Sequence, residues 1–81
     1  MPATPEQICD TFRTNMRARR LELGMTQQEL AELIGQSSSA VSYIESGARS
    51  PELRTMAKIA IALKTTLGAL TSADTFAEIA S

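Results

Sequence analysis

Hydroxyl groups are concentrated in one short stretch of the chain, GQSSSAVSY at residues 35–43. Serine and tyrosine hydroxyls both donate and accept hydrogen bonds. Serine forms helices only moderately well, because its hydroxyl competes for nearby backbone groups. A flexible loop is one explanation for so many serines. A second is a short helix whose hydroxyls lie against the surface of another molecule.

Groups that carry catalysis or bind metals are scarce. The chain has no histidine, and its single cysteine, Cys9, excludes an internal disulfide. Without histidine, a zinc site is not expected. No general base, phosphate-cradling glycine loop or convincing carboxylate pair indicates an enzyme. We therefore expect no catalytic residue, no metal and no cofactor, so hydrogen bonding is the chemistry that the sequence offers.

The composition favours a single all-α domain. The chain has 81 residues and is rich in Ala, Leu, Glu and Gln, with few β-branched runs. The formal net charge of −1 argues mildly against a nucleic-acid partner, but the arrangement of charges matters more. Basic residues crowd near the N-terminus at Arg13, Arg17, Arg19 and Arg20. No stretch reaches the roughly 18 apolar residues of a membrane span, so we expect a cytoplasmic protein without a membrane partner.

Capping patterns divide the first half of the chain into three helices. Capping boxes of the form Thr-x-x-Gln or Thr-x-x-Glu mark helix starts at Thr4 and Thr26. Glycines suited to the left-handed C-terminal position end these helices, at Gly24 and Gly35. Ser37 caps a third helix, which a glycine at position 47 closes. The expected apolar faces are Ile8, Phe12, Met16, Leu21 and Leu23, then Leu30, Ala31, Leu33 and Ile34, then Val41 and Ile44.

The second half predicts a long helix, a short helix and a tail. Ser50 and Pro51 resemble a cap followed by a proline in the first helical position. Thr66 caps a fifth, short helix. The expected apolar faces are Leu53, Met56, Ala57, Ala60 and Leu63, then Leu67 and Leu70. We expect one domain over residues 1–72, followed by a tail over residues 73–81.

The tail offers an extra helical turn or a dimer contact. Asp74 would cap such a turn, and Phe76 and Ile79 would then form an apolar strip at helical spacing. That strip could close over the first helix or contact a second copy of the chain. The sequence does not choose between these arrangements.

The two short helices at about residues 26–34 and 37–45 are the informative pair. Two helices joined by a turn of about three or four residues that contains glycine form a helix-turn-helix. Ala31 is small where the two helices would cross, while Val41 and Ile44 would bury the back of the second helix. The hydroxyl-bearing side then faces outward, at Ser38, Ser39, Ser42 and Tyr43.

The segment GMTQQELAELIGQSSSAVSYIESGARSPELRTMAKIAIAL resembles the DNA-binding domain of the phage repressor and Cro family, also called the Xre family. The matching positions are Arg20, Gly24, Thr26, Gln27, Leu30, Ala31, Gly35, Val41, Ser42, Ile44, Glu45, Gly47 and Pro51. The resemblance covers about residues 13–70. It implies an all-α, compact five-helix, lambda-repressor-like bundle with the helix-turn-helix at its second and third helices.

The resemblance also implies roles for individual residues. The third helix would enter the major groove of double-stranded DNA and read base edges with Ser38, Ser39, Ser42 and Tyr43. Backbone phosphates would be bound by Gln27, Ser37, Arg17, Arg49 and the backbone near Ser46. Arg20 and Glu45 would form an ion pair that ties the first helix to the end of the third.

Each assignment has a plain structural alternative. The serines could form a solvated helix face, the Tyr43 ring could pack at the edge of the core, and Gln27 could be a simple first-turn residue. Serine also discriminates weakly between bases, whereas other family members carry Gln or Arg here. Specificity could then depend on Tyr43, thymine methyl groups, water or DNA shape.

The sequence therefore predicts a sequence-specific DNA-binding transcriptional regulator. It would bind a palindromic operator as a homodimer, with half-sites roughly 34 Å apart. The alternative is an antitoxin-like or co-regulator protein-interaction module on the same fold, which the net charge of −1 and the uncharged recognition face favour. Binding to a duplex that weakens steeply with salt would separate the two.

Overall fold

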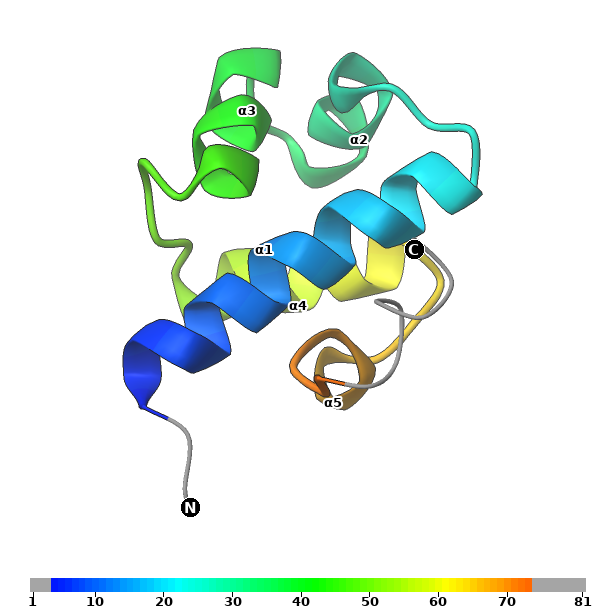
Figure 1. Ribbon diagram of the computed structural model, residues 1–81. Helices are drawn as coiled ribbons and strands as arrows, with labels where there is room; N and C mark the ends of the chain where they lie inside the picture. Colours follow the sequence, from blue (N-terminus) through cyan, green and yellow to red (C-terminus); the bar gives the residue numbers. More distant parts are fainter. Residues whose placement is uncertain (1–3, 74–81) are drawn as a thin grey trace.

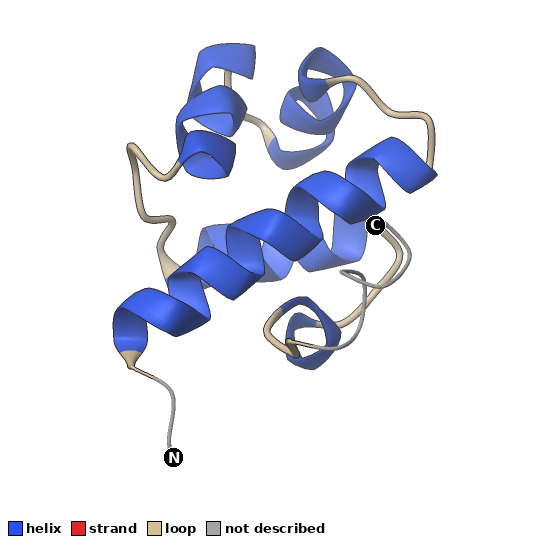
Figure 2. Ribbon diagram, viewed as in Figure 1, coloured by secondary structure: helices blue, strands red, loops and turns tan. Residues whose placement is uncertain are grey.

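The structure, a computed structural model, describes residues 4–73, and within that range it consists of helices joined by loops (Figure 2). The elements are α1 (Pro5–Glu22), α2 (Gln27–Ile34), α3 (Ser38–Ser46), α4 (Leu53–Ala62) and α5 (Leu67–Leu70). This confirms the predicted all-α class with five helices. The turn expected at Asp74, Phe76 and Ile79 lies outside the described residues.

Side-chain caps begin the first three helices where the sequence predicts. Thr4 Oγ1 accepts from the Gln7 N–H at 3.2 Å, and Gln7 Oε1 accepts from the Thr4 N–H at 2.8 Å. Thr26 and Glu29 repeat this reciprocal pair, with both distances at 3.0 Å. Ser37 Oγ accepts from the Ala40 N–H at 3.1 Å. Local hydrogen bonds therefore fix the starts of α1, α2 and α3.

The helices are arranged around α1, which crosses the molecule with α2 and α3 on one side, α4 behind it and α5 on the opposite side (Figure 1). Apolar side chains from every helix meet at the centre. The buried core consists of Phe12, Met16, Leu30, Ala31, Ile34, Val41, Ile44, Ile59, Ala60, Leu63 and Leu70. Removing these side chains from water is the main driving force that holds the short helices together.

The start of α4 and its buried face differ from the prediction. Helix α4 begins at Leu53 and not at Pro51, with Glu52 at the N-cap making no side-chain capping bond. Leu53 is 70% exposed and Ala57 is also exposed, whereas Ile59, which the predicted stripe omitted, is fully buried. The reason is that α4 has apolar residues on two faces, so spacing alone does not identify the face that packs inward.

Three more apolar residues predicted for the inner faces point toward solvent. Ile8, Leu21 and Leu33 are all exposed. In α2, Leu30 and Ile34 already occupy the inner side, and Leu33 lies on the adjacent outer side. A helix this short buries only a narrow stripe, so one of its four apolar residues stays outside.

A buried asparagine closes the bundle at α5. Asn15 is 1% exposed, and its Nδ2 donates to the carbonyl oxygens of Leu70 at 2.9 Å and Ser72 at 2.8 Å. One turn further along α1, Arg19 Nε donates to the Leu63 carbonyl oxygen at 2.9 Å. Both side chains therefore bind carbonyl groups at helix ends, which would otherwise lack partners. Neither role was predicted from the sequence.

Replacing Asn15 with alanine is expected to destabilise the fold by about 1–3 kcal/mol, because two carbonyl groups at the end of α5 lose their donor. Urea denaturation monitored by circular dichroism measures this change. Thr14→Ala, at the neighbouring exposed position, is the control and should alter the midpoint little. Equal midpoints for Asn15→Ala and the parent chain would show that the two hydrogen bonds contribute nothing to stability.

The contribution of the α2 capping box to stability should depend on pH. The hydrogen bond from the Thr26 backbone N–H, and next that from the Thr26 hydroxyl, hold the pKa of Glu29 below its ordinary value. A lowered pKa means that this contribution is present above the unfolded-state pKa and is lost as pH falls through the folded-state pKa. Glu29→Gln should therefore have a lower free energy of unfolding than the parent chain at neutral pH. The difference between the two proteins should disappear in acid.

Denaturant midpoints measured from pH 7 down to pH 3 test this expectation for Glu29. The control is Glu52→Gln, since Glu52 makes no capping bond with its side chain. A constant difference between the parent chain and Glu29→Gln over the whole pH range would contradict the assignment.

Candidate nucleic-acid interface

Helices α2 and α3 meet through a short left-handed turn. Gly35 ends α2 with φ of +71°, a conformation that a residue with a Cβ adopts only at a cost. The next residue, Gln36, donates its N–H to the Ala31 carbonyl oxygen at 2.9 Å. Ala31 is fully buried in the core that both helices share. The two helices thus form a helix-turn-helix, and both lie on the same side of α1 (Figure 1).

Helix α3 is divided into a buried side and an outer side. Ala40, Val41 and Ile44 are buried against the rest of the bundle. The outer side carries the hydroxyls singled out in the sequence, with Ser38 and Ser42 half-buried and Ser39 and Tyr43 exposed. The outer side of α3 carries no charged residue, so hydrogen bonding and aromatic contact are its available chemistry.

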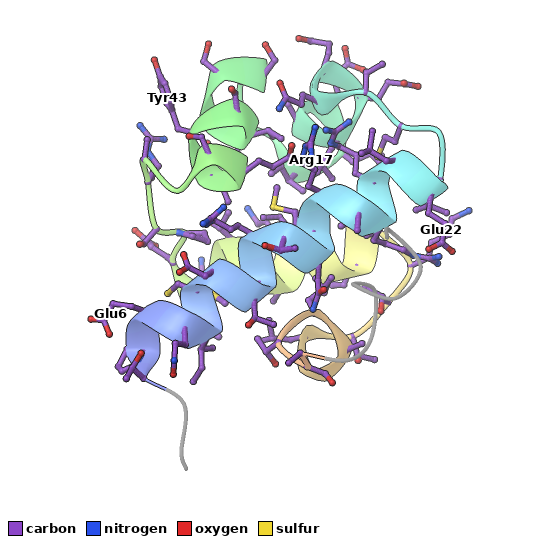
Figure 3. All side chains as sticks on the ribbon, in the orientation of Figure 1. Glu6, Arg17, Glu22 and Tyr43 are labelled. Carbon is purple, nitrogen blue, oxygen red and sulfur yellow. The ribbon has the colours of Figure 1, made fainter. Side chains whose placement is uncertain are left out.

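Tyr43 extends away from the bundle at the outer edge of α3 (Figure 3). Its side of the helix is open, and the residue is 50% exposed. The Arg49 guanidinium lies over the ring, with Cζ 5.8 Å from the ring centroid, and the Arg49 N–H donates to the Tyr43 carbonyl oxygen at 3.1 Å. A cation over an aromatic face is attracted to it, so the loop after α3 supports the orientation of this ring.

The serines at the two ends of α3 are already engaged in local hydrogen bonds. Ser37 Oγ caps the helix, as described above, and keeps its hydroxyl hydrogen free to donate. Ser46 Oγ donates to the Tyr43 carbonyl oxygen at 3.2 Å and accepts from the Ala48 N–H at 3.4 Å. Both hydroxyls therefore stabilise the ends of α3, in addition to any contact with a ligand.

Arg20 and Glu45 form a buried bidentate ion pair. Arg20 Nε donates to Glu45 Oε2 at 2.7 Å and Arg20 Nη2 donates to Glu45 Oε1 at 2.9 Å, and the two side chains are 8% and 3% exposed. Arg20 Nη1 also donates to the Met25 carbonyl oxygen at 2.8 Å. The pair expected from the resemblance is thus present, and it joins α1, the turn before α2 and the end of α3.

Gln27 extends this network to the start of α2. Its Nε2 donates to Glu45 Oε1 at 3.1 Å, so one carboxylate oxygen accepts from two helices. The amide retains a second N–H, which the network does not use. Arg17, one turn before Arg20, is exposed and lies on the side of α1 that faces α2 and α3 (Figure 3). Cationic and amide donors therefore flank the helix-turn-helix.

A protein-family model matches the part of the chain that contains the helix-turn-helix. The helix-turn-helix family model matches residues 16–70, which is more than half of the chain and includes α2, α3, α4 and α5. The chain belongs to the Xre/Cro-like helix-turn-helix family. The resemblance inferred from the motif residues is thereby confirmed.

Two relatives of this helix-turn-helix protein come from different organisms. A protein from Methanothermobacter thermautotrophicus is 45% identical over 52 residues, which cover 64% of this chain and 75% of the relative. A protein from Archaeoglobus fulgidus is 42% identical over 49 residues, which cover 60% and 70%. Each relative is described as an uncharacterized HTH-type transcriptional regulator. No solved structure matches the chain.

Two other kinds of site are absent from the part of the helix-turn-helix protein that the structure describes. In residues 4–73, no helix is long and apolar enough to cross a membrane. In the same residues, no group of three or more His, Cys, Asp or Glu side chains is placed to hold a metal ion.

Breaking the buried ion pair from one side is expected to lower the free energy of unfolding substantially. Arg20→Ala would leave the Glu45 carboxylate buried without its cation, at a cost of about 3–5 kcal/mol. Chemical denaturation of the helix-turn-helix protein measures this loss. The matched control is Arg17→Ala, which removes an exposed arginine from the same helix and should change the free energy of unfolding by less than about 0.5 kcal/mol.

Arg20→Lys gives a second test of the same pair. Lysine keeps the charge but cannot supply the planar fork that contacts both oxygens of Glu45. Its stability should lie between those of the parent and Arg20→Ala. An Arg20→Ala protein that unfolds at the parent midpoint would refute the structural importance of the pair.

Proposed function

We propose that this helix-turn-helix protein is a sequence-specific, double-stranded-DNA-binding regulator of transcription that acts in the cytoplasm. Helix α3 would lie in the major groove, whose width admits a helix. The observation that carries the proposal is the outward hydroxyl face of α3, fixed to α1 by the buried Arg20–Glu45 pair and to α2 by the Gln27–Glu45 hydrogen bond. Family membership and the description of both relatives as transcriptional regulators support it.

Base edges would be read by the outer side of α3: Ser38, Ser39, Ser42 and Tyr43. A serine hydroxyl can donate to one base and accept from another, so the three serines would discriminate weakly. Tyr43 offers both a hydroxyl and an apolar ring that suits a thymine methyl group. Because Arg49 covers one face of that ring, the hydroxyl and the outer edge would approach the DNA.

Phosphate contacts would place α3 in the groove. The free N–H of the Gln27 amide and the positive end of the α2 dipole favour an anion at the start of α2. The other proposed phosphate ligands are Ser37, Arg17, Arg49 and the backbone near Ser46. Since Glu45 binds the other amide N–H of Gln27, the buried pair and the phosphate contact share one hydrogen-bonded network.

The proposed operator is palindromic and the proposed binding form is a homodimer. Two copies related by a two-fold axis would present two α3 helices about one DNA turn, roughly 34 Å, apart. Catalysis and cofactors have no part in this function, since binding alone regulates access to the DNA.

A second candidate function is an antitoxin-like or co-regulator protein-interaction module on the same fold. The uncharged outer side of α3 and the net charge of −1 favour it, because both reduce the general attraction to phosphates. Selection of bound duplexes from a random pool distinguishes the candidates. Enrichment of a two-fold symmetric site supports the regulator, and absence of any enrichment at low salt supports the protein-interaction module.

Arg49→Ala is expected to weaken binding to the selected duplex and to make it less sensitive to salt. Removing one phosphate contact should lower the magnitude of the slope of log affinity against log salt by about 1. Fluorescence anisotropy over a series of salt concentrations measures both quantities. Arg54→Ala removes an exposed arginine from α4 and is the control. An unchanged slope for Arg49→Ala, or an equal change for Arg54→Ala, would exclude the proposed contact.

A further inference from the structure

An apolar hollow lies between α2 and α4, outside the outer side of α3. Leu33 and Ile61 are 61% and 77% exposed, which is far from the burial of the core side chains. Together with Met25 and Ala62 they line a shallow hollow on the surface. Exposed apolar side chains that adjoin one another are typical of a contact surface, whereas isolated ones are normal.

The hollow is also lined by basic side chains. Lys58 and Lys64 line it together with the apolar residues. Neither lysine forms an ion pair with any carboxylate in residues 4–73. An occupant that combines apolar side chains with carboxylates would therefore satisfy both parts of this surface, whereas a second copy of the same hollow would bring like charges together.

The chain carries such a segment at residues 74–81, DTFAEIAS. All eight basic side chains lie in residues 4–73, which contain only seven of the nine acidic ones. The remaining two carboxylates are Asp74 and Glu78, and they alternate with Phe76 and Ile79. Residues 4–73 therefore carry a formal net charge of +1, and this segment carries −2. Its two carboxylates stand next to two large apolar residues in the sequence.

Hydrogen bonds on α1 fix the point from which this segment leaves. Asn15 Nδ2 holds the Ser72 carbonyl oxygen at 2.8 Å. Arg19, four residues along α1, binds the carbonyl oxygens of Leu63 and Lys64 at 2.9 and 3.4 Å. Four residues of a helix rise by about 6 Å, so α1 holds the Ser72 and Lys64 carbonyl groups about one helical turn apart along its length. Eight extended residues span up to about 26 Å, which is longer than the roughly 8–10 Å between the axes of two packed helices.

We propose that residues 74–81 dock in cis into the α2–α4 hollow, with Phe76 and Ile79 against Leu33 and Ile61 and the two carboxylates beside Lys58 and Lys64. The segment would thereby cover an apolar surface that would otherwise attract other chains. The proposal uses none of the DNA-facing residues, so it stands or falls independently of DNA binding.

Disulfide trapping tests the proposal in the full-length chain. The native thiol is removed by Cys9→Ser, and Ile61→Cys is combined with Ile79→Cys. Under mild oxidation, docking in cis gives a disulfide within one chain, seen as a faster monomer band on a non-reducing gel. The matched control combines Ser39→Cys with Ile79→Cys, which should give little internal disulfide. A disulfide only between chains, or equal trapping in the control, would overturn the proposal.

Dye binding gives an independent measurement that needs no engineered cysteine. A chain that ends at Ala73 should bind a fluorescent apolar dye several-fold more strongly than the full-length chain. Adding Leu33→Gln and Ile61→Gln to the shortened chain should remove most of that increase, because these side chains form the exposed surface. Equal dye fluorescence for the full-length and shortened chains, both shown to be folded by circular dichroism, would refute docking.

Discussion

The buried contact between Arg20 and Glu45 fixes how α1, α2 and α3 are placed relative to one another. It lies where α1, the turn before α2 and the end of α3 meet, and it fixes all three through paired hydrogen bonds. Burying two charges is expensive, and the pair offsets that cost only while its geometry is complete. Helix α3 has only nine residues, and the paired hydrogen bonds add a directional constraint that apolar packing supplies less strongly.

The same contact links folding to the proposed recognition of DNA. Glu45 accepts from Gln27 as well as from Arg20, so the start of α2 and the end of α3 are held by one carboxylate. In the proposed complex, Gln27 would contact a phosphate while α3 contacts bases, and their relative position would be set before DNA arrives. Preorganisation of this kind lowers the entropic cost of binding. It suits a reading surface made of short side chains, which cannot reach far to correct a misplaced helix.

Most helix starts were predictable from local sequence patterns, whereas a contact between distant residues was predictable only where the family resemblance supplied it. The capping box of Thr26 and Glu29 involves neighbours, so its pattern specifies the start of α2. The inner face of α4 was not predictable, because Ala57 and Ile59 both belong to apolar faces. Asn15 gave no signal, since its partners lie 55 and 57 residues away. In the candidate site, position on α3 identified the outer residues, and family resemblance identified the ion pair. No pattern in the sequence indicated the bond from the start of α2 to Glu45.

The division of α3 into two sides separates what the helix needs for folding from what it presents. Ala40, Val41 and Ile44 face inward, and the buried carboxylate completes that side. Ser39 and Tyr43, on the outer side, are exposed and lie outside the buried core. Exchanges at those outer positions can therefore accumulate at little cost to the free energy of unfolding. Substitutions on the outer side of α3 could in this way change the preferred target while every intermediate sequence still folds.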